Sequence, residues 1–100
     1  MKQYTNQIQT AKLIELGFEK PKSNHRYWRG NELVINTNYS IGELIEFLPE
    51  SINWHSRKII KNTLIYSIGY QDEIYVFDIH EELIDNLFDA CVQFKENNII

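Results

Sequence analysis

Several features that would narrow the function are scarce in this sequence of 100 residues. The single cysteine, Cys91, excludes an intramolecular disulfide framework. The four glycines are scattered singly along the chain and form no phosphate-binding loop. The longest uninterrupted apolar run, Ile74–Phe77, is far shorter than the roughly 20 residues that cross a membrane as a helix. Residues 1–7 are polar and lack the apolar stretch of a signal peptide. We therefore expect a cytoplasmic protein.

The composition indicates a chain that folds without cross-links. Hydrophobic residues make up 43% of the sequence and aromatic residues 13%, and both are spread along its whole length. This is enough apolar material to fill a core, which argues against intrinsic disorder. A chain of this length is close to the commonest domain size. We expect a single globular domain over residues 1–100.

The net charge of −4 is distributed unevenly. Residues 1–62 contain nine Lys/Arg and six Asp/Glu, a charge of +3, whereas residues 63–100 contain one Lys and eight Asp/Glu, a charge of −7. Long-range charge governs association more than it governs fold. Complementary surface patches, and association of two copies through them, are expected if the two halves reach different faces.

Two helices are expected in the first half of the chain. The first covers about residues 5–16 and ends at Gly17, because a glycine there can take the left-handed conformation that closes a helix. Ser40 and Glu43 have the spacing of a capping box, in which each side chain accepts from a backbone N–H of the other. The second helix therefore begins at this pair and ends before Pro49.

The third helix, about residues 79–97, has the clearest apolar repeat at 3.6-residue spacing. Asp78 and Glu81 are expected to form a second capping box at its start. Before it, residues 25–29 and 32–36 flank Gly30-Asn31 and predict a hairpin. Stretches 57–61, 63–68 and 73–77 are rich in Ile, Tyr and Val and predict two or three further strands, depending on whether Asn62 interrupts the first of them.

These elements predict an α+β fold in the order α-β-β-α-β-β-α, with room for one extra strand. Short connections favour a small antiparallel sheet with the three helices on one face.

Catalytic and metal-binding groups are few. Cys91 lies on the apolar side of the last helix, far from the helix N-terminus that lowers a thiol pKa, and is expected to be buried and unreactive. His25, His55 and His80 lack the i, i+4 spacing of a helical metal site. We expect no catalytic residue, no metal and no other cofactor. A small-molecule enzyme is the third of three interpretations.

Two stretches place aromatic side chains among cations, a combination that suits phosphate contact together with base stacking. The same cations can simply protect strand edges from aggregation, and the acidic second half would repel nucleic acid. The candidate nucleic-acid-binding residues are Arg26, Trp28, Arg29, Trp54, Arg57 and Lys58.

An acidic stripe lies on the polar face of the last helix. Within it Asp85 and Asp89 are like charges at i, i+4, which costs roughly a few tenths of a kcal/mol, and only Lys95 is nearby in sequence to offset them. A solvated helix face is one explanation, and a basic protein partner is the other. The candidate protein-binding residues are Glu82, Asp85, Asp89 and Glu96.

Three segments carry a resemblance. Residues 10–18 followed by Pro21, residues 39–44 and residues 82–88 are similar to segments of small uncharacterised proteins of phages, prophages and mobile elements of gut bacteria. The resemblance covers about a third of the chain, mostly in residues that form the fold. It implies an accessory protein with no assigned activity, and it carries over no catalytic residue.

The leading interpretation is a non-enzymatic accessory protein that binds another protein, including a second copy of itself. The alternative is a nucleic-acid-binding module that uses the aromatic and basic strands.

The capping box generates a prediction about stability. Replacing Ser40 by Ala removes the side-chain acceptor at the helix start, so the free energy of unfolding should fall by about 1 kcal/mol in a denaturant titration. A change below about 0.3 kcal/mol would show that tertiary packing alone holds the second helix.

Overall fold

The computed structural model describes residues 2–22 and 24–100, and at residues 24, 25, 27 and 36 it describes the backbone only. The helices are α1 (Gln7–Glu15), α2 (Ile41–Phe47) and α3 (Leu83–Glu96). The strands are β1 (Asn24–Arg29), β2 (Glu32–Thr37), β3 (Ser51–Ile52), β4 (His55–Ile60), β5 (Thr63–Ile68) and β6 (Asp72–Phe77). The expected α+β class and element order are confirmed: the extra strand comes from the separation of β4 and β5, and the two-residue β3 is a strand that the sequence did not predict. No helix in the described part of the chain has both the length and the apolar character needed to cross a bilayer.

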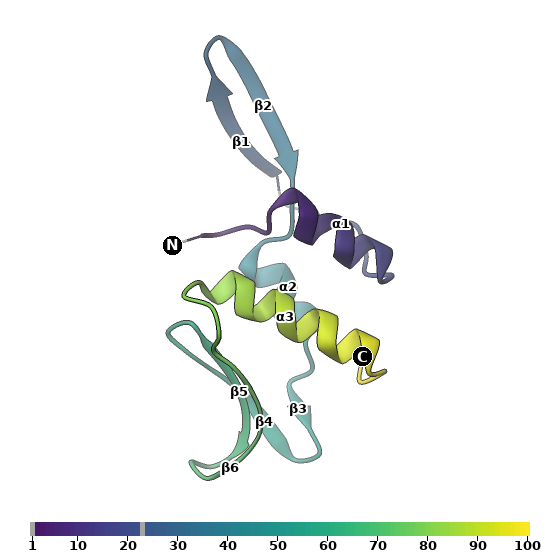
Figure 1. Cartoon of the computed structure of the whole chain (residues 1–100), viewed down its shortest axis with the longest axis vertical. Coiled ribbons are helices and arrows are strands. Elements are labelled where there is room, and N and C mark those ends of the chain that lie inside the picture. Colours follow the sequence, from purple (N-terminus) through teal and green to yellow (C-terminus); the bar gives the residue numbers. More distant parts are fainter. Residues whose placement is uncertain (1, 23) are drawn as a thin grey trace.

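The strands form two antiparallel sheets instead of one. β1 and β2 pair only with each other, and the second sheet has the order β3-β4-β5-β6. α3 lies against β5 and β6 and also contacts α1 and α2, which makes it the central element of the body (Figure 1). The core consists of the buried apolar side chains that meet around α3: Leu13, Tyr39, Leu44, Leu48, Leu64, Tyr66, Phe77, Ile84, Leu87, Ala90, Cys91 and Phe94.

α1 begins two residues later than the sequence predicts. Asn6 is its N-cap, and a capping box joins Asn6 to Gln9. The predicted end at Gly17 is confirmed: Gly17 has a φ of +98°. The N–H of Phe18 bonds to the carbonyl of Leu13 and the N–H of Gly17 to that of Ile14, the hydrogen-bond pair of a Schellman motif.

α2 starts and stops as predicted. Ser40 is the N-cap, its Oγ accepts from the N–H of Glu43 at 3.1 Å, and Glu43 Oε1 accepts from the N–H of Ser40 at 3.2 Å. The helix ends at Phe47, before Pro49. Leu44 and Leu48 are buried, so this short helix is held by its cap and by the core together.

The start of α3 differs from the prediction. The helix begins at Leu83, not near residue 79, and its N-cap residue Glu82 makes no side-chain capping bond. The reason is the fully buried amide of Asn86, whose Oδ1 accepts from the N–H of His80 at 3.0 Å. Its Nδ2 donates to the carbonyls of Asn62 at 2.6 Å and of His80 at 3.0 Å. These bonds hold the segment before α3 in a non-helical conformation.

Lys61 and Asn62 separate β4 from β5, which answers the question that the sequence leaves open. They form the turn between the paired residues Ile60 and Thr63, and Lys61 takes a φ of +55°. Tyr66, at the middle of β5, packs edge-on against Phe94 of α3 with ring centroids 5.5 Å apart. The sheet is thereby fixed to the helix above it.

The β1–β2 hairpin, called the arm below, projects from the body (Figure 1). Its two strands are paired along their whole length, from the pair Asn24–Thr37 at the base to the pair Arg29–Glu32 at the tip. Gly30, in the turn at the tip, has a φ of +62°. The base of the arm is fixed by a buried network in which Thr10 Oγ1 lies 2.7 Å from both Thr5 Oγ1 and Asn38 Oδ1. The arm therefore has a rigid base and strands that lie outside the core.

Asn86 generates the prediction for this part of the structure. Asn86→Ala should lower the free energy of unfolding by about 3 kcal/mol, because the buried groups bonded to the amide lose their partner. Gln93→Ala, at an exposed position of the same helix, is the matched control and should change it by less than about 0.5 kcal/mol. Equal effects of the two substitutions in urea titrations would contradict the role assigned to Asn86.

Candidate protein-binding surfaces

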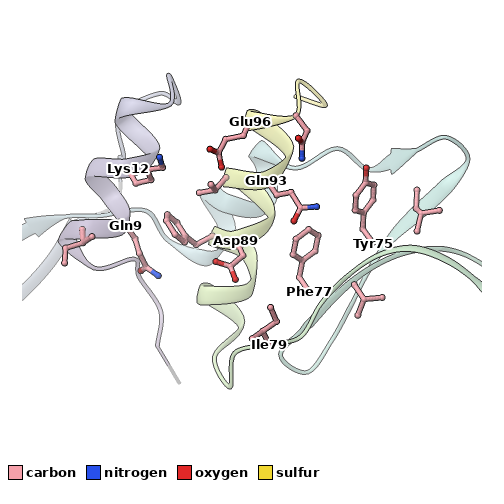
Figure 2. A pocket seen from close by; sticks show the side chains of 14 residues that line it. Gln9, Lys12, Tyr75, Phe77, Ile79, Asp89, Gln93 and Glu96 are labelled. Atoms are coloured by element: carbon pink, nitrogen blue, oxygen red, sulfur yellow. The ribbon is translucent and has the colours of Figure 1, made fainter.

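A broad groove of about 1010 Å³ runs along the outer side of α3. Figure 2 shows Gln9 and Lys12 of α1 on one side of α3 and Tyr75 and Phe77 of β6 on the other. The lining comprises Ile8, Gln9, Lys12, Ile74, Tyr75, Val76, Phe77, Ile79, Phe88, Asp89, Val92, Gln93, Glu96 and Asn97. It combines an apolar surface with a few polar groups, which is the composition of a binding site.

The groove has large apolar side chains at its borders and an aromatic floor. Ile8 on α1 and Ile79 before α3 are each 83% exposed, although they are large aliphatic residues. Tyr75 and Phe77 line the floor and also pack against Phe94, with ring centroids 4.9 and 5.5 Å apart. The floor is rigid because the same rings belong to the core.

The acidic stripe is not one continuous solvated face. The Glu82 carboxylate accepts from the N–H of Lys2 at 3.0 Å, and the Asp85 carboxylate accepts from Lys2 Nζ at 3.0 Å and from Gln9 Nε2 at 2.8 Å. Burial tends to raise the pKa of Asp85, but the bonds from Gln9 and Lys2 outweigh it and the pKa of Asp85 is lowered. The positive charge beside Asp85 comes from Lys2, which is 83 residues away in the sequence, and not from a neighbour along the helix.

The other half of the acidic stripe reaches the groove. Asp89 and Glu96 both line it, and Asp89 Oδ2 lies 2.7 Å from His80 Nε2. Glu96 is exposed. Of the four predicted protein-binding residues, the structure thus places two at a candidate binding surface and engages the other two with the N-terminal segment.

The arm carries an exposed face of mixed apolar and basic character. Directly paired residues in an antiparallel ladder share a face, so the pairs Arg26–Ile35 and Trp28–Leu33 lie on the same side of the arm. Trp28, Leu33 and Ile35 are 70%, 47% and 52% exposed. Arg29 pairs with Glu32 and belongs to the opposite face. This apolar–basic face is the second candidate surface.

The six candidate nucleic-acid residues do not come together. Arg26, Trp28 and Arg29 lie on the arm, whereas the other three belong to the turn and strand at the opposite end of the molecule (Figure 1). Arg57 Nη1 donates to the carbonyls of Ile45 and Leu48, at 3.0 and 3.1 Å, which satisfies the end of α2.

Lys58 and Trp54 are the other two candidate nucleic-acid residues at the end of the molecule opposite the arm. Lys58 Nζ donates to the carbonyl of Gly69 and lies 5.1 Å from the centre of the Tyr70 ring. Trp54 is 91% exposed in the β3–β4 turn and has a φ of +70°, an unusual conformation for a bulky side chain. It is the one member of this group whose side chain is presented to solvent without a described polar contact.

Leu33 and Ile35 were absent from the sequence-based site. Their signal was the apolar run at residues 33–35 beside a hairpin turn, but only the strand register shows that they share a face with Trp28. The groove residue Ile8 is likewise a large aliphatic side chain of a helix that faces solvent. Exposure depends on what packs against an element, which local periodicity does not contain.

No candidate metal centre appears among the described side chains. There is no group of three His, Cys, Asp or Glu residues that could hold a metal ion within residues 2–22 and 24–100. The side chain of His25 lies outside the described residues. Cys91 is fully buried as predicted, its thiol points to the Leu44 carbonyl 3.8 Å away, and burial raises the pKa of Cys91 to about 12.

No protein-family model, no curated protein and no solved structure matches this chain.

His55 generates a prediction about pH. Burial tends to lower the pKa of His55, but its hydrogen bonds to the Asn53 carbonyl (2.7 Å) and the Asp72 carboxylate (3.1 Å) outweigh this, and the pKa is raised. A raised folded-state pKa stabilises the fold below the unfolded value of about 6.5, and this contribution is lost as pH rises through the folded value. The free energy of unfolding should therefore fall from about pH 6 to about pH 8.

The matched comparison is His55→Gln, measured by urea titration at the same pH values. This variant should show a smaller fall than the wild type, and Asp72→Asn should show an intermediate one. A pH dependence that is identical in all three proteins would show that other groups carry it.

Proposed function

We propose that this chain is a non-enzymatic accessory protein that acts by binding another protein molecule through the arm. The observation that supports this most directly is the exposed apolar–basic face of Arg26, Trp28, Leu33 and Ile35. Exposed apolar patches on small soluble proteins mark interaction sites. Tryptophan and arginine are also the residues most enriched at the energetic centres of protein interfaces.

The construction of the arm supports the same proposal. A two-stranded hairpin alone is marginally stable in water, and it gains stability when its apolar face is covered. The buried network of Thr5, Thr10 and Asn38 holds the base of the arm, and among the described residues β1 and β2 make extensive contact only with each other. An arm of this design presents a surface at little conformational cost, since its orientation is set before the partner arrives.

Nucleic acid is the second candidate partner, and one observation favours it. A two-stranded antiparallel ribbon has the dimensions to enter the major groove of DNA, and residues 20–29 contain Lys20, Lys22, Arg26 and Arg29. However, Arg26 shares its face with Trp28, Leu33 and Ile35, and Arg57 and Lys58 are engaged within the chain. The apolar content favours a protein partner.

The expected setting is also part of the proposal. The segments that resemble small proteins of phages, prophages and mobile elements suggest an accessory role in such an element, in the cytoplasm of the host cell. The sequence motifs support this origin, and the arm supports the mode of action.

A photo-crosslinking experiment tests the proposal. A photoreactive amino acid in place of Trp28 should crosslink the purified chain, or the chain in host extract, to protein. The same amino acid in place of Tyr70, an aromatic residue that is exposed at the tip of another hairpin, is the matched control and should crosslink far less.

Two outcomes would contradict protein binding through the arm. Equal crosslinking from positions 28 and 70 would show that the arm has no particular affinity. Binding of DNA or RNA in a mobility shift, with affinity that falls steeply as salt rises and is lost in Trp28→Ala, would establish the alternative function.

A further inference from the structure

Resting on the proposed function, we infer that the partner of the arm is a second copy of this chain. In this arrangement the arm of each protomer lies in the α1–α3–β6 groove of the other. Arg26, Trp28, Leu33 and Ile35 would cover the apolar groove surface, and Arg26 would face Asp89 and Glu96.

The two surfaces are present in one chain but cannot meet within it. The arm projects from the end of the body where α1 begins and points away from α3 (Figure 1), some of whose residues in the range 88–96 line the groove. Its base is fixed by hydrogen bonds from Thr5 and Thr10, and the N–H of Tyr39 donates to Thr5 Oγ1 at 3.0 Å. Folding back onto its own groove would break this buried network. The arm can therefore reach such a groove only on another molecule.

Charge complementarity points to this occupant. On the arm, Arg26 is the charged residue of the apolar–basic face, and the charged side chains that line the groove are Lys12, Asp89 and Glu96. Asp89 also contacts His80 Nε2 at 2.7 Å, and Glu96 is exposed, so the groove has two carboxylates and one cation to meet Arg26. A basic residue on an otherwise apolar arm fits an apolar groove that has carboxylates on one helix.

The apolar parts also correspond in kind. The arm face offers Trp28, Leu33 and Ile35, and the groove offers exposed aliphatic side chains such as Ile8 and Ile79. Covering both removes these apolar side chains from water.

Two-fold symmetry completes the arrangement. If one arm enters the groove of the partner, the same rotation places the partner's arm in the first groove, so the contact is made twice and the assembly closes as a dimer. Closure explains why a chain can expose two apolar surfaces without forming an open polymer.

Charge reversal tests the contact itself. The wild type should sediment as a dimer, and Arg26→Glu and Glu96→Lys should each weaken dimerisation by about tenfold or more, because each places like charges in both contacts. An equimolar mixture of the two variants should restore dimers. In the mixed dimer the reversed arm of one protomer meets the reversed groove of the other, and the second contact is that of the wild type. The double variant Arg26→Glu/Glu96→Lys should restore them within a single protein.

The controls separate position from net charge. Arg29→Glu makes the same charge change on the opposite face of the arm, and Glu73→Lys reverses an exposed carboxylate outside the groove lining. Both should dimerise like the wild type. In a Cys91→Ala background, Trp28→Cys protomers mixed with Gln93→Cys protomers should form a disulfide-linked heterodimer, and Tyr70→Cys protomers should not.

The outcomes distinguish this inference from the proposed function. A monomeric wild type whose position 28 crosslinks to a different protein would overturn the second copy as partner and leave protein binding intact. A dimer that tolerates both charge reversals, or a mixture that does not restore association, would overturn the arm–groove contact. A monomer that crosslinks to no protein would overturn both.

Discussion

The packing of α3 onto the four-stranded sheet is the constraint on which the rest of the structure depends. Phe94 is at its centre, because Tyr66, Tyr75 and Phe77 all place their rings within 5.5 Å of its ring centre. These four aromatic residues provide a large part of the buried apolar surface of a small domain, and edge-to-face contacts of this kind also fix orientation. With α3 held in this way, one of its sides is committed to the core and the other remains for the groove.

The N-terminal segment has a second organising role. Between Lys2 and Thr10 it supplies the ammonium group that engages Asp85 and the hydroxyl network that holds Asn38. Together with its backbone N–H, which bonds to Glu82, Lys2 engages two carboxylates of the acidic stripe, and the hydroxyl network fixes the base of the arm. A polar segment that looks unimportant in the sequence therefore decides which charges remain available and where the arm points.

The body and the arm differ in construction and therefore in the role that each can have. The body has one buried core, capped N-termini at α1 and α2 and a buried cysteine whose pKa is raised, all of which suit a stable scaffold. The arm has none of these and keeps Trp28 in solvent. Because exposed apolar surface is costly in a monomer, a scaffold that maintains it is explained by a partner that covers it, and the inferred partner surface is the groove on a second copy.

Local interactions were determined by the sequence itself. The Ser40–Glu43 capping box, the Gly17 helix end and the Gly30-Asn31 hairpin depend on residues within a few positions of one another, so short motifs were enough to predict them. The α+β order followed from their succession. Helix caps and tight turns are determined by the conformational preferences and hydrogen bonds of neighbouring residues, and contacts with distant residues did not change them.

Only the tertiary structure decided what depends on residues far apart in the chain. Asn86 moved the start of α3 from the predicted capping box to Leu83, because its amide bonds to His80 and also to Asn62, 24 residues away. Lys2 divided the acidic stripe, and Arg57 turned from a candidate nucleic-acid contact into the partner of the carbonyls that end α2. A charged or polar side chain finds its lowest free energy with whichever buried or opposite group the fold brings near it, and that neighbour is set by packing, not by spacing in the sequence.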